Sequence, residues 1–589
     1  MRILLFATLA GALLLPEGLS AQRLSADGAA QTFRFLSEQY FDQIYFKYSP
    51  TSGTAAGLHQ YDTQLEDYSS ANIASEVAAL HEIEKKLAQI DPSALDAEPA
   101  GDYAILTGRV HADLLQLETI RNWEKNPDSY SSGVTNSIFV LMERPYAPVN
   151  TRLRAAVERE RHIPQVLLEA RKNLKNPPKI YTEIALEQID GLVSFFQNDV
   201  PSAFTGADDP KAKAEFATTN AAVVEALKSY GVWMKSDLLA RSNGDFRFGQ
   251  DTFQKALLYN EMVDIPLDKL LQIGLNDLHK NQAEFARVAR EIDPNKTPQQ
   301  ELAELATIHV APDQLLATFQ NTFDSLKAFI RAKHIITIPS DVPPVLEETP
   351  PFMRATTQAS MDPSGPFETH STKAYFNVTL PEKGWSAERV AEHMAAFNVG
   401  TVVSTSVHEA YPGHYVQFLW QDQFPSKIRQ LLGANSSIEG WAHYCEQMML
   451  DEGYGQPGEG AKDAHESKLI HLGQLQDALL RDARFIVGIR LHTGVGGAMS
   501  QEEAVNFFIR EGYQSRSIGE METKRGTSDA LYLYYTLGKL EILKLRADVR
   551  KKQGAAFNLQ SFHDDYMRQG PAPMKVIRKA MLHDDSPVL

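Results

Sequence analysis

Apolar residues recur at spacings of three and four along most of the chain, with charged residues between them. Residues 75–90, SEVAALHEIEKKLAQI, and 150–175, NTRLRAAVERERHIPQVLLEARKNLK, are typical of this pattern. Such spacing places the apolar side chains on one face of an α-helix. Residues 298–334 repeat the pattern twice, and Pro312 at the break between the repeats predicts helix, turn and helix. The chain as a whole therefore predicts a mainly α fold.

The pattern changes over residues 335–385, which are rich in proline, threonine and serine. The runs HIITI (334–338) and AYFNVTL (374–380) are β-branched or aromatic and predict short strands. We expect this stretch to be an ordered, irregular segment with a small β element, because several of its aromatic and aliphatic residues favour burial. A disordered linker is the alternative. The expected architecture is one large helical body of two halves, 22–334 and 335–589, around a deep cleft.

The N-terminal sequence MRILLFATLAGALLLPEGLSAQ is typical of a secretory signal peptide. Arg2 precedes an apolar run over 3–15, and the small residues Ser20 and Ala21 follow, so we expect cleavage that removes residues 1–21. An uncleaved anchor helix is the alternative, but the run is shorter than the ~20 residues that a membrane span needs. We expect a periplasmic or secreted protein with no stable membrane insertion after cleavage.

The composition is that of a folded, globular protein. Of 589 residues, 43% are hydrophobic and 23% are charged, which is typical of a globular chain. The net charge of −17 argues against nucleic acid or an anionic membrane as a partner. Cys445 is the only cysteine, so no disulfide supports the fold, and its largely apolar surroundings predict a buried, inert thiol.

The segment TVVSTSVHEAYPGHYVQFLW begins like a zinc-protease helix, with His408 followed by Glu409. The second histidine of H-E-x-x-H would stand at 412, but that residue is proline, and the next histidine is His414. On a straight helix, residues six apart are rotated by about 240° about the helix axis, so their side chains lie on different sides. Pro412 must bend or stop the helix, and Gly413 frees the backbone to return. A broken helix can therefore place both imidazoles at one metal ion.

A second segment provides an internal control. HESKLIH, residues 465–471, has the same His-Glu-x-x-x-x-His skeleton but no Pro-Gly. It lies in a plain amphipathic stretch, so we expect His465 and His471 to diverge and to be surface or structural histidines.

A third ligand is predicted in NSSIEGWAHYCEQMML, residues 435–450. Glu439 follows His414 by 25 residues, which fits a helix, a loop and a second helix packed on the first. His443 and Glu446 continue the same helix face, so a ligand with a supporting group behind it is one interpretation. A solvent-facing Glu439 and a core-edge His443 are the alternatives, and whether His443 contacts the metal stays open.

HEAYPGHYVQ followed by EGWAHYCEQ resembles a large bacterial family that is catalogued as a domain of unknown function, with the signature H-E-x-x-P-G-H-x-x-Q and E-G-W-A. Its members are regarded as zinc metallopeptidases, distantly similar to the helical clan of thimet oligopeptidase, angiotensin-converting enzyme and Taq-type carboxypeptidase. SPTSGTAAGLHQYD is similar to the family's Pro-Thr-Gly turn. LLRDARFIVGIRLHTG resembles a further helix, with Gly488 where aspartate is common, and METKRGTSDALYLYYTLGK lacks the usual Pro-Gly-Gln-Ala. The resemblance extends over about residues 25–585.

The resemblance implies that His408, His414 and Glu439 bind Zn²⁺, which keeps a fourth position open for water. Glu409 would be the general base, and Gln417 would hydrogen-bond a ligand.

Tyr535, His492 and Arg525 are the candidates for stabilising the oxyanion. Each also has an ordinary structural interpretation: a core tyrosine, a helix-face histidine and an arginine paired with Glu522. Arg525 could instead bind a substrate carboxylate, which would favour cleavage from the C-terminus.

The resulting prediction is a secreted zinc-dependent metallopeptidase that hydrolyses short peptides. A zinc amidase acting on a non-peptide or modified-peptide amide, and a catalytically silent peptide-binding protein, are the alternatives. The sequence leaves open the bond cleaved, endo- or exopeptidase action, the physiological substrate and the oligomeric state.

Overall fold

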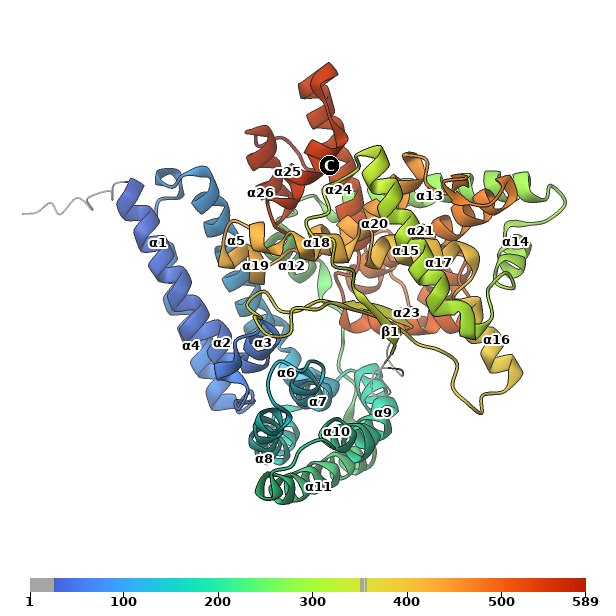
Figure 1. Ribbon diagram of the computed structural model, residues 1–589. Helices are drawn as coiled ribbons and strands as arrows, with labels where there is room; N and C mark the ends of the chain where they lie inside the picture. Colours follow the sequence, from blue (N-terminus) through green and yellow to red (C-terminus); the bar gives the residue numbers. More distant parts are fainter. Residues whose placement is uncertain (1–25, 350–353, 355–357) are drawn as a thin grey trace, which may run out of the picture.

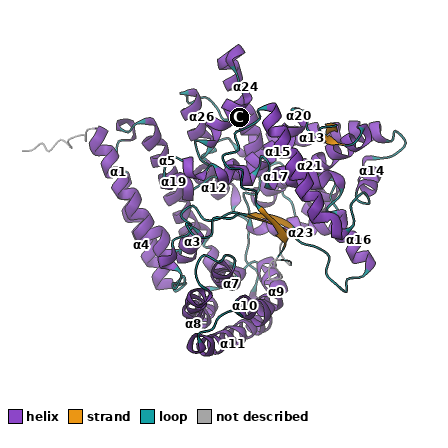
Figure 2. Cartoon of the chain, viewed as in Figure 1, coloured by secondary structure: helices purple, strands orange, loops and turns teal. Residues whose placement is uncertain are grey.

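The computed structural model describes residues 26–349, 354 and 358–589. The predicted signal peptide lies outside the described residues. Helices make up most of the described chain, with a few short strands, which confirms the mainly α fold with a small β element (Figure 2). None of the helices in the described ranges combines the length and apolar character that a membrane crossing requires.

Fifteen α-helices precede the small sheet in the described part of the chain. They are α1 (Ala26–Tyr40), α2 (Phe46–Tyr48), α3 (Pro50–Ala55), α4 (Ser70–Leu87), α5 (Ala97–Leu114), α6 (Asn122–Lys125), α7 (Asp128–Met142), α8 (Val149–Asn173), α9 (Lys179–Ser194), α10 (Val200–Ala203), α11 (Pro210–Trp233), α12 (Gly249–Glu261), α13 (Leu267–Ile292), α14 (Pro298–Leu305) and α15 (Leu315–Lys333).

The remaining helices follow the sheet. They are α16 (Ala387–Ala395), α17 (Val399–Glu409), α18 (His414–Leu419), α19 (Lys427–Leu431), α20 (Asn435–Asp451), α21 (Ala464–Thr493), α22 (Gln501–Arg510), α23 (Arg516–Ser528), α24 (Tyr534–Gln553), α25 (Leu559–Met567) and α26 (Met574–Leu582), with a two-residue strand pair, β4 (Gln456–Pro457) and β5 (Gly460–Ala461), between α20 and α21.

The helix predictions are confirmed. The pattern over 75–90 falls within α4 and its C-cap region, and that over 150–175 forms α8. Residues 298–334 form α14, a turn at Pro312 and α15, although α14 ends earlier than the pattern indicates, at Leu305. Cys445 is buried, and burial raises its pKa well above the usual value, in agreement with the inert thiol expected there.

The small sheet has the strand order β1-β3-β2. β3 (Tyr375–Val378) lies within the predicted AYFNVTL strand and pairs parallel with β1 (Val345–Glu348) and antiparallel with β2 (Ala359–Asp362). The strand predicted at HIITI is wrong. Two of its backbone groups bond to side chains of α25 instead of a neighbouring strand: His563 donates to the Ile335 carbonyl at 2.7 Å, and the Thr337 N–H donates to Asp564 at 2.9 Å.

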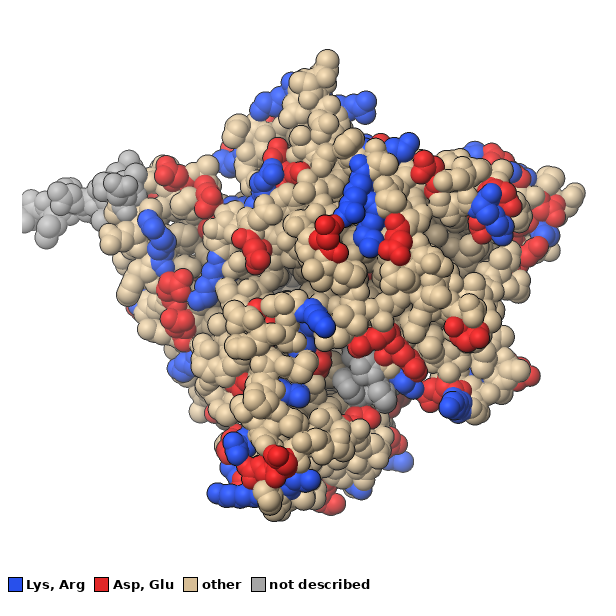
Figure 3. All heavy atoms as spheres, viewed as in Figure 1, with Lys and Arg blue, Asp and Glu red and all other residues tan. Residues whose placement is uncertain are grey.

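The largest hydrophobic core takes residues from both sides of the boundary predicted at residue 334. It joins α1–α5 to α15, to α17–α20 and to the last helices. A second core lies within α7–α11, which Figure 1 shows as a group below the sheet. The division into two halves and the deep cleft stay predictions. Lysine and arginine are interspersed with aspartate and glutamate over the face drawn in Figure 3.

Two glycine pairs let the helices around α17 and α20 cross with their backbones nearly touching. A Cβ added to Gly400 of α17 would lie 2.8 Å from the Cα of Gly473 on α21. A Cβ added to Gly440 of α20 would lie 2.4 Å from the Cα of Gly538 on α24. Any larger residue at these crossings would force the helices apart, so the glycines set where α17 and α20 lie.

Candidate metal centre

The helix that carries His408 is broken as the sequence predicts. α17 ends at Glu409 and α18 begins at His414, and the Tyr411–Pro412 peptide between them is cis. The N–H of Gly413 donates to the carbonyl of Val407 at 2.9 Å, so the chain folds back on the end of α17. A Cβ on Gly413 would lie 1.8 Å from the carbonyl oxygen of His408. Only glycine fits this turn, which brings His414 beside His408.

Helix α20 is fastened to the same turn. The indole N–H of Trp441 donates to the carbonyl of Pro412 at 3.0 Å. The side-chain amide of Gln417 donates to the carbonyl of Ser437 at 2.9 Å, rather than to one of the predicted ligands. Each residue of the E-G-W segment thus has a structural role. Glu439 faces the turn, Gly440 allows the crossing with α24, and Trp441 anchors the helix.

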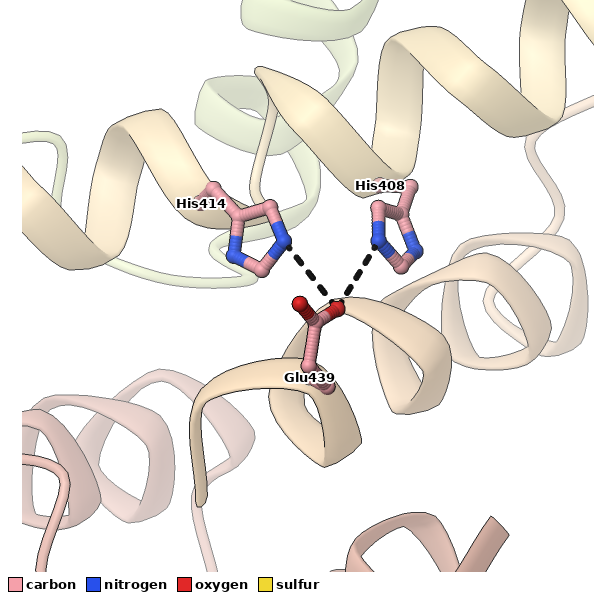
Figure 4. Close-up of side chains that lie close together, drawn as sticks. All are labelled: His408, His414 and Glu439. Atoms are coloured by element: carbon pink, nitrogen blue, oxygen red, sulfur yellow. Dashed lines mark ion pairs between the residues drawn. The ribbon is translucent and has the colours of Figure 1, made fainter. Parts of the chain in front are cut away.

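His408, His414 and Glu439 converge from three helices (Figure 4). The Nε2 atoms of both histidines lie 3.4 Å from Oε2 of Glu439. The ligand atoms all lie within 4.8 Å of one another, and this is the one such set of three that the described residues contain. Two tetrahedral ligands, each at about 2.1 Å from a zinc ion, are about 3.4 Å apart. The distances to Glu439 therefore match a shared metal ion.

The charges of these groups depend on one another. Burial alone would lower the pKa of His408, but hydrogen bonds to the Glu439 and Glu446 carboxylates raise it to about 10. Burial also opposes ionisation of Glu439, yet His414 and His408 hold its pKa well below the usual value. The pocket thus favours one negative carboxylate facing positive charge, which is the arrangement that a bound cation would satisfy.

Glu446 lies behind His408 and orients it. Its buried carboxylate accepts from Nδ1 of His408 at 2.7 Å, which directs Nε2 of that ring toward Glu439. The same carboxylate accepts from Nδ1 of His443 at 3.1 Å and pairs with Arg481 at 3.3 Å. Burial opposes ionisation of Glu446, but Arg481 and the imidazoles lower its pKa.

His443 therefore supports Glu446 and lies outside the ligand set, and burial lowers its pKa to about 4. The helical spacing predicts the correct helix face for Glu446 but not this role. The missed signal is the spacing of seven residues from Glu439, which is about two helical turns. Arg481 had no local signal, because it reaches Glu446 from α21.

Glu409 is held by the sheet. Its Oε2 accepts the backbone N–H of Met361 at 3.1 Å. Met361 lies in β2, which is an edge strand, and its N–H points away from β3. No sequence motif marks this contact, because the donor is a backbone group.

Tyr535 lies beside the candidate metal centre, and Arg525 contacts Tyr535. The ring centroids of Tyr535 and His408 are 6.4 Å apart. Arg525 donates to the Tyr535 hydroxyl at 3.4 Å, and the guanidinium of Arg484 lies 4.8 Å from the centre of its ring. Of the three predicted oxyanion candidates, the structure thus brings Tyr535 beside a candidate ligand and links Arg525 to Tyr535.

Arg525 does not pair with Glu522, as its structural interpretation supposed. Its ion pair is with Asp529 at 3.2 Å, and Glu522 instead receives two hydrogen bonds from Arg484, both at 2.7 Å.

His492 has a different environment. Its Nε2 donates to the carbonyl of Gly526 at 2.7 Å, and its ring lies among Phe246, Phe248 and Phe253. Burial lowers the pKa of His492 to about 4, so it stays neutral near pH 7. Its described contacts hold the end of α23 and include none of the three candidate ligands, so they favour the structural interpretation over oxyanion binding.

Residues 50–581 match the family described as "Bacterial protein of unknown function (DUF885)". The chain belongs to this family. DUF885 membership confirms the bacterial family expected from the motif pair, while metallopeptidase activity and the relation to the thimet oligopeptidase clan stay predictions.

Two solved structures share the DUF885 fold of this chain. That of a putative lipoprotein of unknown function from Shewanella oneidensis has a TM-score of 0.77 and 26% identity, and covers 95% of this chain and 100% of its own. That of a putative lipoprotein from Colwellia psychrerythraea has a TM-score of 0.76 and 18% identity, and covers 95% and 99%. No match was found among curated proteins.

Proposed function

We propose that this DUF885 protein is an exported, zinc-dependent peptidase that hydrolyses short peptides. The observation that carries the proposal is the convergence of His408, His414 and Glu439, with Glu409 next to His408 in the chain.

The donor set fits zinc. Two imidazole nitrogens and one carboxylate oxygen are ligands of the kind that catalytic zinc uses, and Glu446 supplies the supporting carboxylate behind one imidazole. His408, His414 and Glu439 would hold Zn²⁺, and the bound ion would supply the Lewis acidity that activates water and polarises a peptide carbonyl.

The other residues would handle protons and charge. The carboxylate of Glu409, oriented by the Met361 N–H, would take a proton from the attacking water and deliver it to the leaving amine. The hydroxyl of Tyr535, oriented by Arg525, would donate a hydrogen bond to the oxyanion of the scissile carbonyl. If Arg525 binds the substrate's terminal carboxylate instead, cleavage would occur from the C-terminus.

Two observations support export to the periplasm or the medium. The N-terminal sequence has the order of charged, apolar and small residues of a signal peptide. Both similar structures are described as putative lipoproteins. We propose peptides as substrates and no nucleic-acid partner, because the net charge of −17 would repel a polyanion.

The test combines metal analysis with digestion of a peptide library by wild type and Glu409→Gln. We expect about one zinc per chain and a loss of turnover of about 100-fold or more in the variant. Glu466→Gln is the matched control, because Glu466 has the same place in the second His-Glu segment; it should keep full activity. Undiminished cleavage by Glu409→Gln would contradict the mechanism.

The same assay decides between the alternatives. Turnover of capped amides but not of peptides would indicate a zinc amidase. Peptide binding without turnover, unaffected by Glu409→Gln, would indicate a silent binding protein.

A further inference from the structure

The connection between β2 and β3, residues 363–374, is packed on the N-terminal helices. The N–H of Phe367 donates to the carbonyl of Ala56 at 2.8 Å. A Cβ on Gly57 would lie 2.3 Å from the Glu368 nitrogen, so the two backbones are in direct contact. The segment SPTSGTAAGLHQYD, which the proposed mechanism does not use, forms this platform.

A part-buried hydrogen bond between two side chains reinforces the platform. Nε2 of His59 lies 2.9 Å from Oε2 of Glu368, whose side chain is only 4% exposed. The connection that leaves β2 is thus held by α3 and the turn after it. These contacts join elements that are more than 300 residues apart in the chain.

Arg144, just after α7, fastens both ends of the same connection. Its Nη2 donates to the carbonyls of Asp362 at 2.6 Å and Pro363 at 2.7 Å, and its Nη1 donates to the carbonyl of Lys373. Nη2 also lies 3.0 Å from the Asp362 carboxylate and 3.4 Å from that of Glu143.

Asp362 ends β2, and its partner in the ladder is the first residue of β3. One buried guanidinium therefore holds the point where the chain leaves one strand and the point where it enters the next. Arginine suits this place because its planar fork offers several donors in a fixed geometry, whereas lysine has a single ammonium group.

The held strand touches the candidate general base. Met361 immediately precedes Asp362, and its N–H donates to Oε2 of Glu409 at 3.1 Å. A continuous path of hydrogen bonds and one peptide unit thus runs from Arg144 through Asp362 and Met361 to Glu409. A shift of β2 would move the donor that orients this carboxylate.

We propose that Arg144 is a positioning residue for Glu409: it holds β2 so that the Met361 N–H meets the carboxylate. The proposal rests on the proposed function for its activity readout. It gives the N-terminal helices a part in the catalytic geometry, although Arg144 itself touches no ligand of the metal centre.

The test compares wild type, Arg144→Met, Arg144→Lys and Arg154→Met in the full-length chain. Arg154 is the matched control, because its exposed side chain pairs with Asp209, at the start of α11, instead of with a residue of the sheet. The measurements are kcat and KM on a peptide substrate, zinc content, and hydrogen exchange over residues 359–378.

For Arg144→Met we expect kcat to fall by about 10- to 100-fold, because small misplacements of a catalytic group have effects of this size. KM should change by less than about 3-fold and zinc should stay near one per chain, because the ligands remain in place. Exchange over 359–378 should be faster. Arg144→Lys should recover part of kcat, and Arg154→Met should equal wild type.

Met361→Pro tests the other end of the path. Proline lacks an N–H, and at an outward-facing position of an edge strand it removes no ladder hydrogen bond. We expect a similar fall in kcat, and little further loss when it is combined with Arg144→Met, because both act through one contact.

Wild-type kcat in Arg144→Met, loss of zinc in that variant, or additive losses in the double variant would overturn the proposal. The exchange measurement separates it from the proposed function. If Arg144→Met exchanges faster over 359–378 in a protein that cleaves no peptide, the result would support the role of Arg144 in holding β2. It would contradict only the proposed peptidase function. Unchanged exchange over 359–378 in Arg144→Met would overturn the role of Arg144 in holding β2, whether or not the protein is a peptidase.

Discussion

The chain contains the skeleton His-Glu-x-x-x-x-His twice, and the two copies differ in structure. At 408–414 the helix is broken, the imidazole centroids are 4.8 Å apart, and both rings face Glu439. At 465–471 the skeleton lies within the uninterrupted helix α21. His465 is exposed there, and His471 lies 3.8 Å from Glu284 of α13.

The second pair diverges, as predicted, and the difference shows what brings the candidate ligands of the first copy together. Both copies have the same two histidines and glutamate at the same spacing. Only the first has a turn in which Gly413 fits against the His408 carbonyl, and only the first has a neighbouring helix that brings a carboxylate to both rings. Backbone geometry, rather than residue type, separates them.

The largest expected effect comes from removing one ligand from each copy. His414→Ala should lose zinc and reduce peptide turnover by about 1000-fold or more, because the activating ion is lost. His471→Ala should keep both. Metal content and kcat/KM measure the difference, and equal losses in the two variants would show that the site is not at 414.

The next effect comes from the turn. Gly413→Ala places a Cβ 1.8 Å from the His408 carbonyl oxygen, so the turn must open. We expect a loss of about 2–4 kcal/mol in the free energy of unfolding and a clear fall in zinc affinity.

Gly191→Ala, in α9 with open space around its Cβ, is the control for the glycine substitution. It should be neutral or slightly stabilising. Denaturant unfolding and zinc titration measure both variants, and normal zinc binding by Gly413→Ala would refute the role of the turn.

A smaller effect is expected from the carboxylates behind each histidine. Glu446→Gln weakens the acceptor that orients His408, so zinc affinity should fall by about 10- to 100-fold. Glu284→Gln, which changes the partner of His471, should leave zinc affinity unaltered. Competition with a coloured chelator measures the zinc affinity of both variants. Equal affinities would contradict the role of Glu446 in orienting His408.

The smallest effect concerns the first turns of α20 and α21 and depends on pH. Glu261 accepts the Ser436 N–H at 3.1 Å, and burial raises its pKa to about 7. The folded state therefore holds this proton more tightly than the unfolded state does. Its contribution to stability is fully present below pH ~4.5 and declines as pH rises to ~7.

Asp463, at the start of α21, should behave in the opposite way. The Glu466 and His465 N–H groups lower its pKa, so its contribution is present at neutral pH and is lost as pH falls. Unfolding measured from pH 3 to 8 should show a shallower decline above pH 4.5 in Glu261→Gln and a smaller acid loss in Asp463→Asn. A Glu261→Gln curve parallel to wild type would exclude the first effect.

The sequence by itself determined the helical body, the broken helix and the three candidate ligands. These features are local: helical periodicity, a proline with a glycine, and a glutamate on the next helix face are visible within a few turns of chain. The strand at 375–378 was visible for the same reason. HIITI was not correctly assigned, because a β-branched run becomes a strand only where a partner lies beside it.

The tertiary structure alone decided which groups surround those ligands. Arg481 reaches Glu446 from another helix, the Met361 N–H reaches Glu409 from an edge strand, and His492 bonds to Gly526 rather than to a candidate ligand. Arg144 fastens that strand from more than 200 residues away in the chain. Such contacts depend on how distant segments cross, and a buried backbone donor has no residue-type signature, so no local pattern could reveal them.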